Sequence, residues 1–180
     1  MNTNKTNATA SKVEAKAQQN NKNENCFMEQ VEEAMRHGGI KKALRIIEAQ
    51  AESGDAHAAY FLGEIYLSGN VCKEDDDKGF HYLMEAANLR HAQALFRLGI
   101  LSITPKHIQE EKAMVFYFFQ EAALLGHAEA ECLLAVCYGI GYGCECDERM
   151  ASIWKSKAAT DQFDAKLVRK TMKHMGLIKK

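Results

Sequence analysis

The chain has 180 residues, 47% of them hydrophobic and 26% charged, and a net charge of −1, which is an ordinary composition for a soluble fold of one domain. Its longest apolar runs, such as Met114–Phe119, are far shorter than a bilayer requires, and the N-terminus carries no apolar segment that could act as a signal peptide. We therefore expect a cytoplasmic protein without a membrane span, and export by a non-standard route stays open.

Charge is distributed unevenly along the chain. Residues 26–154 carry 11 basic and 20 acidic side chains, whereas residues 155–180 carry 8 basic and 2 acidic ones. A basic tail on an acidic body is able to meet nucleic acid or an acidic partner. We favour a simpler interpretation over nucleic-acid binding: a solvated capping helix whose charge complements that of the body.

Residues 1–25 have the composition of a disordered leader. They contain seven asparagines, almost no large apolar side chain and no periodic pattern. Such a segment cannot bury enough surface to offset the entropy of ordering it. We therefore expect the folded part of the chain to begin after it.

Residues 26–54 are predicted to form an incomplete helix pair that caps the N-terminal side. The first helix has apolar residues four apart and ends at His37-Gly38-Gly39; these apolar residues are Phe27, Val31 and Met35. A second helix is expected over residues 40–51. Gly54 follows it where a helix C-terminus commonly needs a left-handed residue.

From residue 55 onward, one pattern recurs every 36 residues. Two small residues open each copy, and a leucine follows four residues after the second of them. These positions are Ala56, Ala58 and Leu62, then Ala92, Ala94 and Leu98, then Ala128, Ala130 and Leu134. A fixed period of this length is typical of a stacked repeat array. We predict three units, at about 55–90, 91–126 and 127–161.

Each unit is predicted to contain a helix A, a loop and a helix B. In the first unit helix A spans about 56–67 and helix B about 76–88, with Asp75 as the N-cap of helix B. The third unit repeats this loop 72 residues later, which aligns Gly69 with Gly141, Cys72 with Cys144 and Asp75 with Asp147. In the second unit Pro105 and Gln109 replace the glycine and the capping Asp, so we expect a differently shaped loop there.

Residues 162–180 are predicted to form a C-terminal capping helix, over about 162–175, and a basic tail. One face of this helix is apolar and the other is basic, as a terminal capping helix requires. The inward set is Phe163, Ala165, Val168, Met172 and Met175, and the outward set is Lys166, Arg169, Lys170 and Lys173.

The repeated residues resemble Sel1-like repeats, relatives of the tetratricopeptide repeat with a longer loop, over roughly residues 40–165. The matching positions are Ala58, Leu62, Gly63, Tyr66, Gly69, Asp75, Lys78, Ala86 and Ala87 in the first unit, Leu98, Gly99, Lys112, Ala113 and residues 122–128 in the second, and Ala130, Leu134, Tyr138, Gly141, Asp147, Ala158 and Ala159 in the third. The resemblance implies an all-α fold, an α-solenoid of stacked antiparallel helix pairs. The chain departs from the family pattern at Ala135, which replaces the usual helix-A glycine, at Gly79, which replaces an alanine, and in the loop at Pro105.

The cysteines and histidines give little support for a chemical site. Cys132 and Cys137 lie about 140° apart on a helix, so they cannot face one metal ion together, and by register they replace apolar core residues. Cys144 and Cys146 fall in a loop, where reactivity or pairing stays open. His91 and His127 occupy the repeat position of Asp55, directly before helix A, and this position explains them without catalysis. We expect no metal ion and no cofactor.

In tetratricopeptide-like stacks the A helices line the concave side, and the resemblance therefore places a row of their side chains there, including His57, Gln93, Glu129, Cys132 and Ile140. We predict that a partner-binding groove with apolar anchors and a charged rim is formed by Tyr60, Glu64, Leu67, Phe96, Ile100, Ile103 and Val136. The alternative that some of these residues, Phe96 in particular, only pack between A helices stays open.

These features favour a non-enzymatic protein-interaction module that binds a protein or peptide on its concave face. The family resemblance implies adaptor or scaffold roles in signalling, host interaction or toxin neutralisation, and the fold alone does not choose among them. Two alternatives stay open: a cysteine-dependent or hydrolytic enzyme that uses Cys144 and Cys146, and nucleic-acid binding through residues 166–180. The sequence specifies neither the partner nor the oligomeric state.

Overall fold

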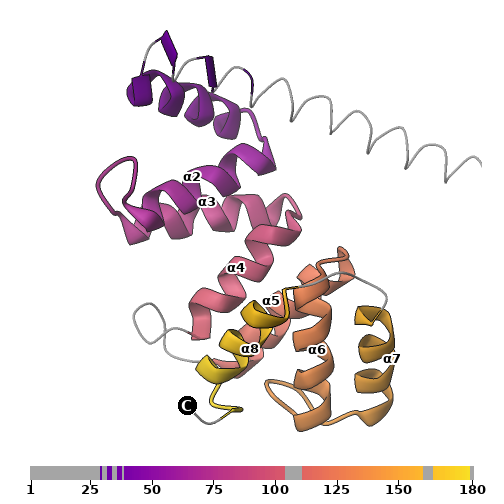
Figure 1. Cartoon of the computed structure of the whole chain (residues 1–180). Coiled ribbons are helices and arrows are strands. Elements are labelled where there is room, and N and C mark those ends of the chain that lie inside the picture. Colours follow the sequence, from indigo (N-terminus) through magenta and orange to yellow (C-terminus); the bar gives the residue numbers. More distant parts are fainter. Residues whose placement is uncertain are drawn as a thin grey trace, which may run out of the picture. The chain divides into compact units, whose positions relative to one another are not determined.

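The computed structural model describes residues 29, 32–33, 36–37, 39–103, 111–159 and 164–178, and every regular element among them is a helix (Figure 1). The chain divides into two compact units, Met1–Ser53 and Gly54–Lys180, which are treated separately below. The predicted leader at residues 1–25 lies outside the described residues. So do Phe27, Val31, Met35, Phe163 and the departures from the repeat pattern at Pro105 and Gln109.

In the first unit, residues 39–52 form a helix, in agreement with the prediction for residues 40–51. Its buried residues are Ala43, Ile47 and Ala51, which lie four apart and so share one helical face. Gly39 has a left-handed φ of 69°, which fits the predicted end of the preceding helix.

In the second unit, the described residues form three helix pairs and one final helix. The first pair is α2 (Ala56–Ser68) and α3 (Asp76–Asn88), the second is α4 (Ala92–Ile103) and α5 (Lys112–Leu124), the third is α6 (Ala128–Ile140) and α7 (Glu148–Ala158), and the final helix is α8 (Ala165–His174). Each pair packs on the next through α3 against α4 and α5 against α6. The bounds of α2 and α3 agree with the predicted helices A and B within one residue.

The repeated loop has the same construction in the first and third pairs. The carboxylate of Asp75 accepts a hydrogen bond from the backbone N–H of Lys78, and that of Asp147 accepts from Arg149 and Met150. Gly69 ends α2 and Gly141 ends α6 with left-handed φ values of 63° and 68°. Both predicted N-caps are therefore confirmed, because each satisfies backbone N–H groups that the helix leaves free.

Glycine allows the two helices of a pair to approach closely. A Cβ atom on Gly63 would lie 2.7 Å from Cγ of Leu83, and one on Gly99 would lie 2.6 Å from Cε1 of Phe119. Cβ atoms do not come this close to carbon in real proteins, so these two positions require glycine. The third pair has Ala135 at this register position, and it faces Lys155 in place of a leucine or phenylalanine.

The final helix α8 is amphipathic, but part of its predicted inward face is wrong. Val168, Thr171 and Met175 are buried, whereas Ala165 is exposed and Met172 is only half-buried. The buried stripe therefore runs through Thr171, whose hydroxyl can be buried because it donates to the carbonyl of Leu167. The four basic residues predicted to face outward are all exposed: Lys166, Arg169, Lys170 and Lys173.

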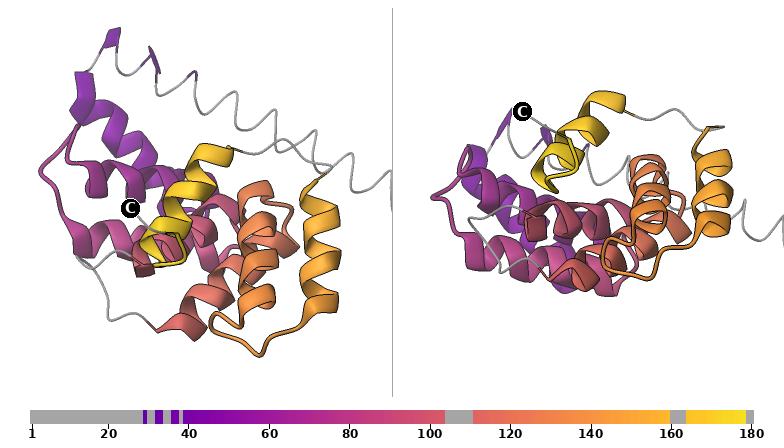
Figure 2. Two further views of the ribbon diagram at one scale, coloured as in Figure 1. Left: turned by 60° about the horizontal axis from the view of Figure 1, so that its bottom comes forward. Right: turned by 90° about the horizontal axis from the view of Figure 1, so that it is seen from below.

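The expected position of α8, at the end of the array, is also wrong. α8 makes its main helix contact with α6, and α7 and α8 lie on different sides of α6 (Figures 1 and 2). Charge supplies a physical reason. On α6, Glu129 faces the start of α8 and accepts a hydrogen bond from the backbone N–H of Asp164, whereas α7 carries three basic residues and one acidic one, which disfavours contact with the basic α8.

Candidate functional site

Tyr60 and Glu64, two of the predicted partner-binding residues, face the next A helix within the array. The Tyr60 ring stacks on His91 with 4.9 Å between ring centroids, and Oε1 of Glu64 accepts a hydrogen bond of 2.6 Å from Nε of Arg97 on α4. Burial, and then the nearby Glu64 carboxylate, raise the pKa of Tyr60. Both side chains are half-buried and already have partners in the neighbouring pair.

Phe96 and Ile103 are core residues, which corrects their prediction as surface anchors. They are 6% and 5% exposed, and the Phe96 ring stacks on His127 at a centroid distance of 4.2 Å. Phe96 therefore packs inside the array, as the alternative interpretation of the sequence had it. Leu67 is half-buried and packs closely on Gly79 of α3. A Cβ atom on Gly79 would lie 2.5 Å from Cγ of Leu67.

The histidines before α4 and α6 join successive pairs. Nδ1 of His91 accepts from the backbone N–H of Ala94, and Nε2 of His91 lies 3.1 Å from Nδ1 of His57. Burial, and then the neighbouring His57, lower the pKa of His91 to about 4, and burial also lowers the pKa of His127. Both imidazoles are thus neutral near pH 7, and they pack on Tyr60 and Phe96 as aromatic rings.

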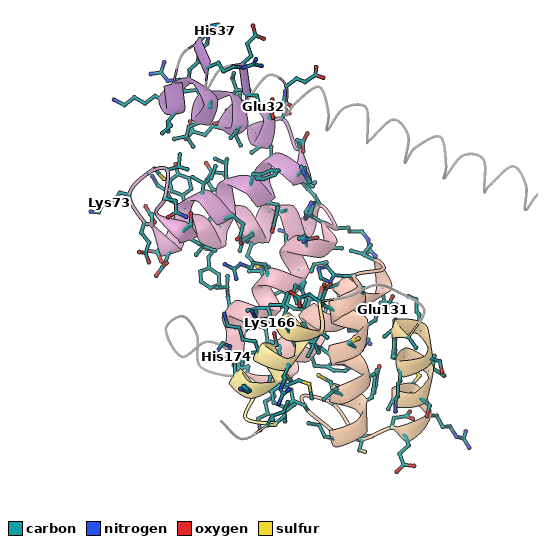
Figure 3. The ribbon with its side chains drawn as sticks, viewed as in Figure 1. Glu32, His37, Lys73, Glu131, Lys166 and His174 are labelled. Atoms are coloured by element: carbon teal, nitrogen blue, oxygen red, sulfur yellow. The ribbon has the colours of Figure 1, made fainter. Side chains whose placement is uncertain are left out.

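We define the A-helix face as the side of α4 and α6 on which Gln93 and Glu129 lie. α8 packs on α6 on this side. Oε1 of Glu129 on α6 accepts a hydrogen bond of 3.0 Å from the backbone N–H of Asp164, the N-cap of α8. One repeat earlier, the same register position on α4 is Gln93, and it is exposed. In Figure 3, the label Lys166 marks the start of α8 and the label His174 marks its end.

A pocket of about 710 Å³ opens on the third pair, and we call it the end groove. α6 contributes Cys132, Ala135 and Val136, and α7 and its C-cap contribute Glu148, Ala151, Ser152, Lys155, Ala158 and Ala159. Val136 is the one predicted site residue in this pocket. Most of the lining side chains are small, and Lys155 and Glu148 supply the charges.

Among the residues that the structure describes, no helix packs on the third pair in the register in which α4 packs on the first and α6 on the second. In the second pair the equivalent positions include Phe119, Ala122 and Ala123, all with no exposed surface, and α6 packs on this pair. In the third pair the corresponding residues are Lys155, Ala158 and Ala159, of which Lys155 and Ala159 are exposed. Exposure at the same register positions therefore depends on whether a further A helix is present.

A buried ion pair that was not predicted from the sequence joins α6 and α7. Glu131 has no exposed surface, and its Oε1 lies 2.6 Å from Nζ of Lys157, which also lies 3.5 Å from the carbonyl oxygen of Ala123 (Figure 3 labels Glu131). By register Glu131 replaces Ala59 and Leu95, so a charged residue at an apolar repeat position was the signal that could have revealed it. A buried carboxylate requires such a cation, because desolvation strongly disfavours an isolated charge.

Cys132, Cys137 and Cys144 do not have the properties of a nucleophile. Burial raises the pKa of Cys137 to about 12 and also raises the pKa values of Cys132 and Cys144, so these groups are thiols near pH 7, whereas a reactive cysteine needs a stabilised thiolate. Sγ of Cys144 lies 3.6 Å from the carbonyl oxygen of Cys137, and Sγ of Cys146 lies 3.3 Å from that of Gly139. All five cysteines that the structure describes are free.

The described residues contain no candidate metal site and no candidate membrane-spanning helix. Within residues 39–103, 111–159 and 164–178 and the few described positions before them, no three His, Cys, Asp or Glu side chains are grouped so that they could hold a metal ion. In the same part of the chain, no helix has both the length and the apolar character needed to cross a bilayer.

Repeated helix pairs, stacked so that the second helix of each pair packs on the first helix of the next, define an α-solenoid. The crystal structure of a Sel1 repeat protein from Oxalobacter formigenes is similar, with a TM-score of 0.64 and 27% identity over 72% of this chain and 97% of that one. A protective antigen present in uropathogenic Escherichia coli strains, which displays an SLR fold, has a TM-score of 0.60 and 28% identity over 65% of this chain. This match spans 25% of the antigen's length.

No family model and no curated protein matches the sequence. The two structural matches nevertheless agree with the 36-residue motif in the chain, and the predicted fold is confirmed. The chain has the fold of Sel1-like repeat proteins. This fold is commonly a scaffold for protein interactions.

Proposed function

We propose that this chain is a non-enzymatic interaction module that binds a polypeptide partner on the concave A-helix face. One observation carries the proposal: an amphipathic helix, α8, lies on α6 on this side of the array. The chain thereby supplies an example of the kind of ligand that the face accepts. The cytoplasmic location expected from the sequence belongs to the same proposal, and cell fractionation tests it.

α8 combines buried apolar side chains with a polar contact to α6. Val168 and Met175 are 8% and 6% exposed, and the acidic Glu129 of α6 holds the first turn of α8. Apolar anchors with a charged rim are the usual way in which a groove holds a helical peptide. The residues we assign to the partner surface are therefore Gln93 and Glu129, together with the half-buried Ile100.

Site-specific photo-crosslinking tests this proposal. A photoreactive amino acid replaces Gln93 on α4, and the control chain carries it at Tyr117 on α5, which is 53% exposed. In cells that make the protein, we expect the chain modified at Gln93 to give a specific polypeptide adduct that the control lacks. Equal adducts from both chains, or none from Gln93, would contradict binding on the A-helix face.

A second variant examines the role of α8. Val168→Asp places a charge in the buried stripe of α8 while leaving α2–α7 unchanged. If the partner uses the surface that α8 covers, this variant should increase the adduct formed at Gln93. An unchanged adduct would restrict the partner to the open part of the A-helix face.

A further inference from the structure

We propose that the end groove is a second docking surface, and that its occupant is a partner helix that is acidic in its N-terminal half and presents bulky apolar side chains. This helix would dock on the third pair as α4 docks on the first and α6 on the second. The inference adds a separate surface to the proposed function and does not depend on the A-helix face.

The first step is the register of the array. The groove positions on the third pair correspond, 36 residues earlier, to Phe119, Ala122 and Ala123 of α5, which are fully buried in the second pair: the Phe119 ring packs on Gly99 of α4, and α6 packs on α5. The groove is thus shaped for a helix by the same backbone arrangement that receives helices earlier in the chain.

The second step is the size of the side chains that line the groove. Cys132 stands where the earlier pairs have Tyr60 and Phe96, and Ser152 stands where they have Phe80 and Phe116. The earlier pairs fill the contact with their own aromatic rings, whereas the third pair leaves about 710 Å³ open. An occupant must therefore supply the bulky apolar side chains itself if the contact is to be well packed.

The third step is charge. A helix that docks like α4 or α6 runs parallel to α6 and antiparallel to α7, so its N-terminal half lies beside the C-terminal half of α7, which carries Lys155. Glu131 already pairs with the neighbouring Lys157, but Lys155 projects into the groove and is exposed. Acidic residues in the N-terminal half of an occupant would face Lys155 and would also be favoured by that helix's own dipole.

The helix that follows in the chain does not meet these requirements. The first half of α8 carries Lys166 and Arg169, and Lys170 follows directly; these residues would be brought against Lys155. α8 lies instead on the acidic α6, and this leaves the groove open to a helix of opposite charge.

Defined peptides provide the probe. The acidic peptide is an amphipathic helix about as long as the 13 residues of α6, with Leu and Phe on one face and Glu in its first two turns. The control peptide has Lys in place of each Glu. Fluorescence anisotropy with the full chain should show binding of the acidic peptide that is at least about tenfold tighter than that of the basic one, since opposite charges across an interface favour association.

Two variants assign this binding to the groove. Ser152→Phe introduces the aromatic residue of the second pair and should weaken binding of the acidic peptide by about tenfold or more, because it fills the space that the peptide needs. Lys155→Glu should weaken the acidic peptide and strengthen the basic one. Lys73→Glu, at an exposed loop position of the first pair that Figure 3 labels, makes the same change in net charge and should alter neither.

Ser152 and Lys155 are both exposed, and circular dichroism checks that each variant stays folded. The proposal is overturned if the two peptides bind equally, if Ser152→Phe has no effect, or if Lys155→Glu and Lys73→Glu behave alike. Concentration-dependent dimerisation of the chain that Ser152→Phe abolishes would also overturn it, because the occupant would then be a second copy. None of these results bears on crosslinking at Gln93, so the two proposals fail independently.

Discussion

The second and third helix pairs have the same register but differ in what covers them. α6 packs on the second pair, where Phe119 is completely buried, whereas the third pair has Lys155 at the same position and an open groove above it. The comparison shows that a repeat position has no fixed role as core or surface. Its role depends on whether another pair follows, and the side chains of the third pair match the uncovered situation.

The largest expected effect on stability comes from replacing Phe119 with alanine, and the equivalent Lys155 serves as the comparison. Phe119→Ala should lower the free energy of unfolding by about 3–5 kcal/mol, because it removes a buried ring and leaves a cavity. Lys155→Ala should change it by less than about 0.5 kcal/mol, because this side chain is exposed. Urea unfolding followed by circular dichroism measures both. Similar losses in the two variants would contradict the comparison between a covered and an uncovered pair.

The second prediction concerns Glu131, a charged residue in the third pair at the register position that Leu95 occupies in the second pair. Lys157→Ala should cost about 2–3 kcal/mol, since it leaves a carboxylate buried without its cation; the value is below that of a fully buried pair because the Lys157 side chain is 47% exposed. Combining it with Glu131→Leu should recover most of the loss. If the double variant is no more stable than Lys157→Ala alone, the ion pair is not the cause.

The third prediction compares Gly99 with Ala135. Gly99→Ala should destabilise the chain by about 1–3 kcal/mol, because the new methyl group meets Phe119 and the ring must shift. Ala135→Gly should cost only about 1 kcal/mol, the usual loss of helix propensity. Thermal unfolding compares the two variants. A neutral Gly99→Ala would mean that the helices of the second pair separate at little cost.

The smallest predicted effect is a dependence on pH at the contact between the first and second pairs. The pKa of His91 is about 4 in the folded chain and close to 6.5 when unfolded, so its contribution is complete above pH 6.5 and is lost as the pH falls toward 4. After screening at a partly exposed site, we expect a loss of about 1 kcal/mol. His91→Asn, which keeps a side chain able to cap the helix, should flatten the stability profile between these pH values. An unchanged profile would show that His91 does not protonate on unfolding.

Much of the fold could be predicted because the repeat fixes local structure. The 36-residue period located α2 and α3 within one residue, and it identified Asp75 and Asp147 as N-caps, since capping depends on neighbours in the chain. The site was less predictable. Tyr60, Phe96 and Val136 look alike as apolar residues on A helices, but the first stacks on His91, the second is buried and the third lines an open groove.

The sequence by itself determined the helices, their caps and the order of the three pairs, because these depend on periodicity and on contacts between near neighbours. Only the tertiary structure decided where α8 docks and which copy of a repeated position is left uncovered. An amphipathic helix is specified by its own residues, whereas the surface it covers depends on the charges and shapes of α6 and α7 together. For this reason the end groove could be recognised only when the three pairs were compared in space.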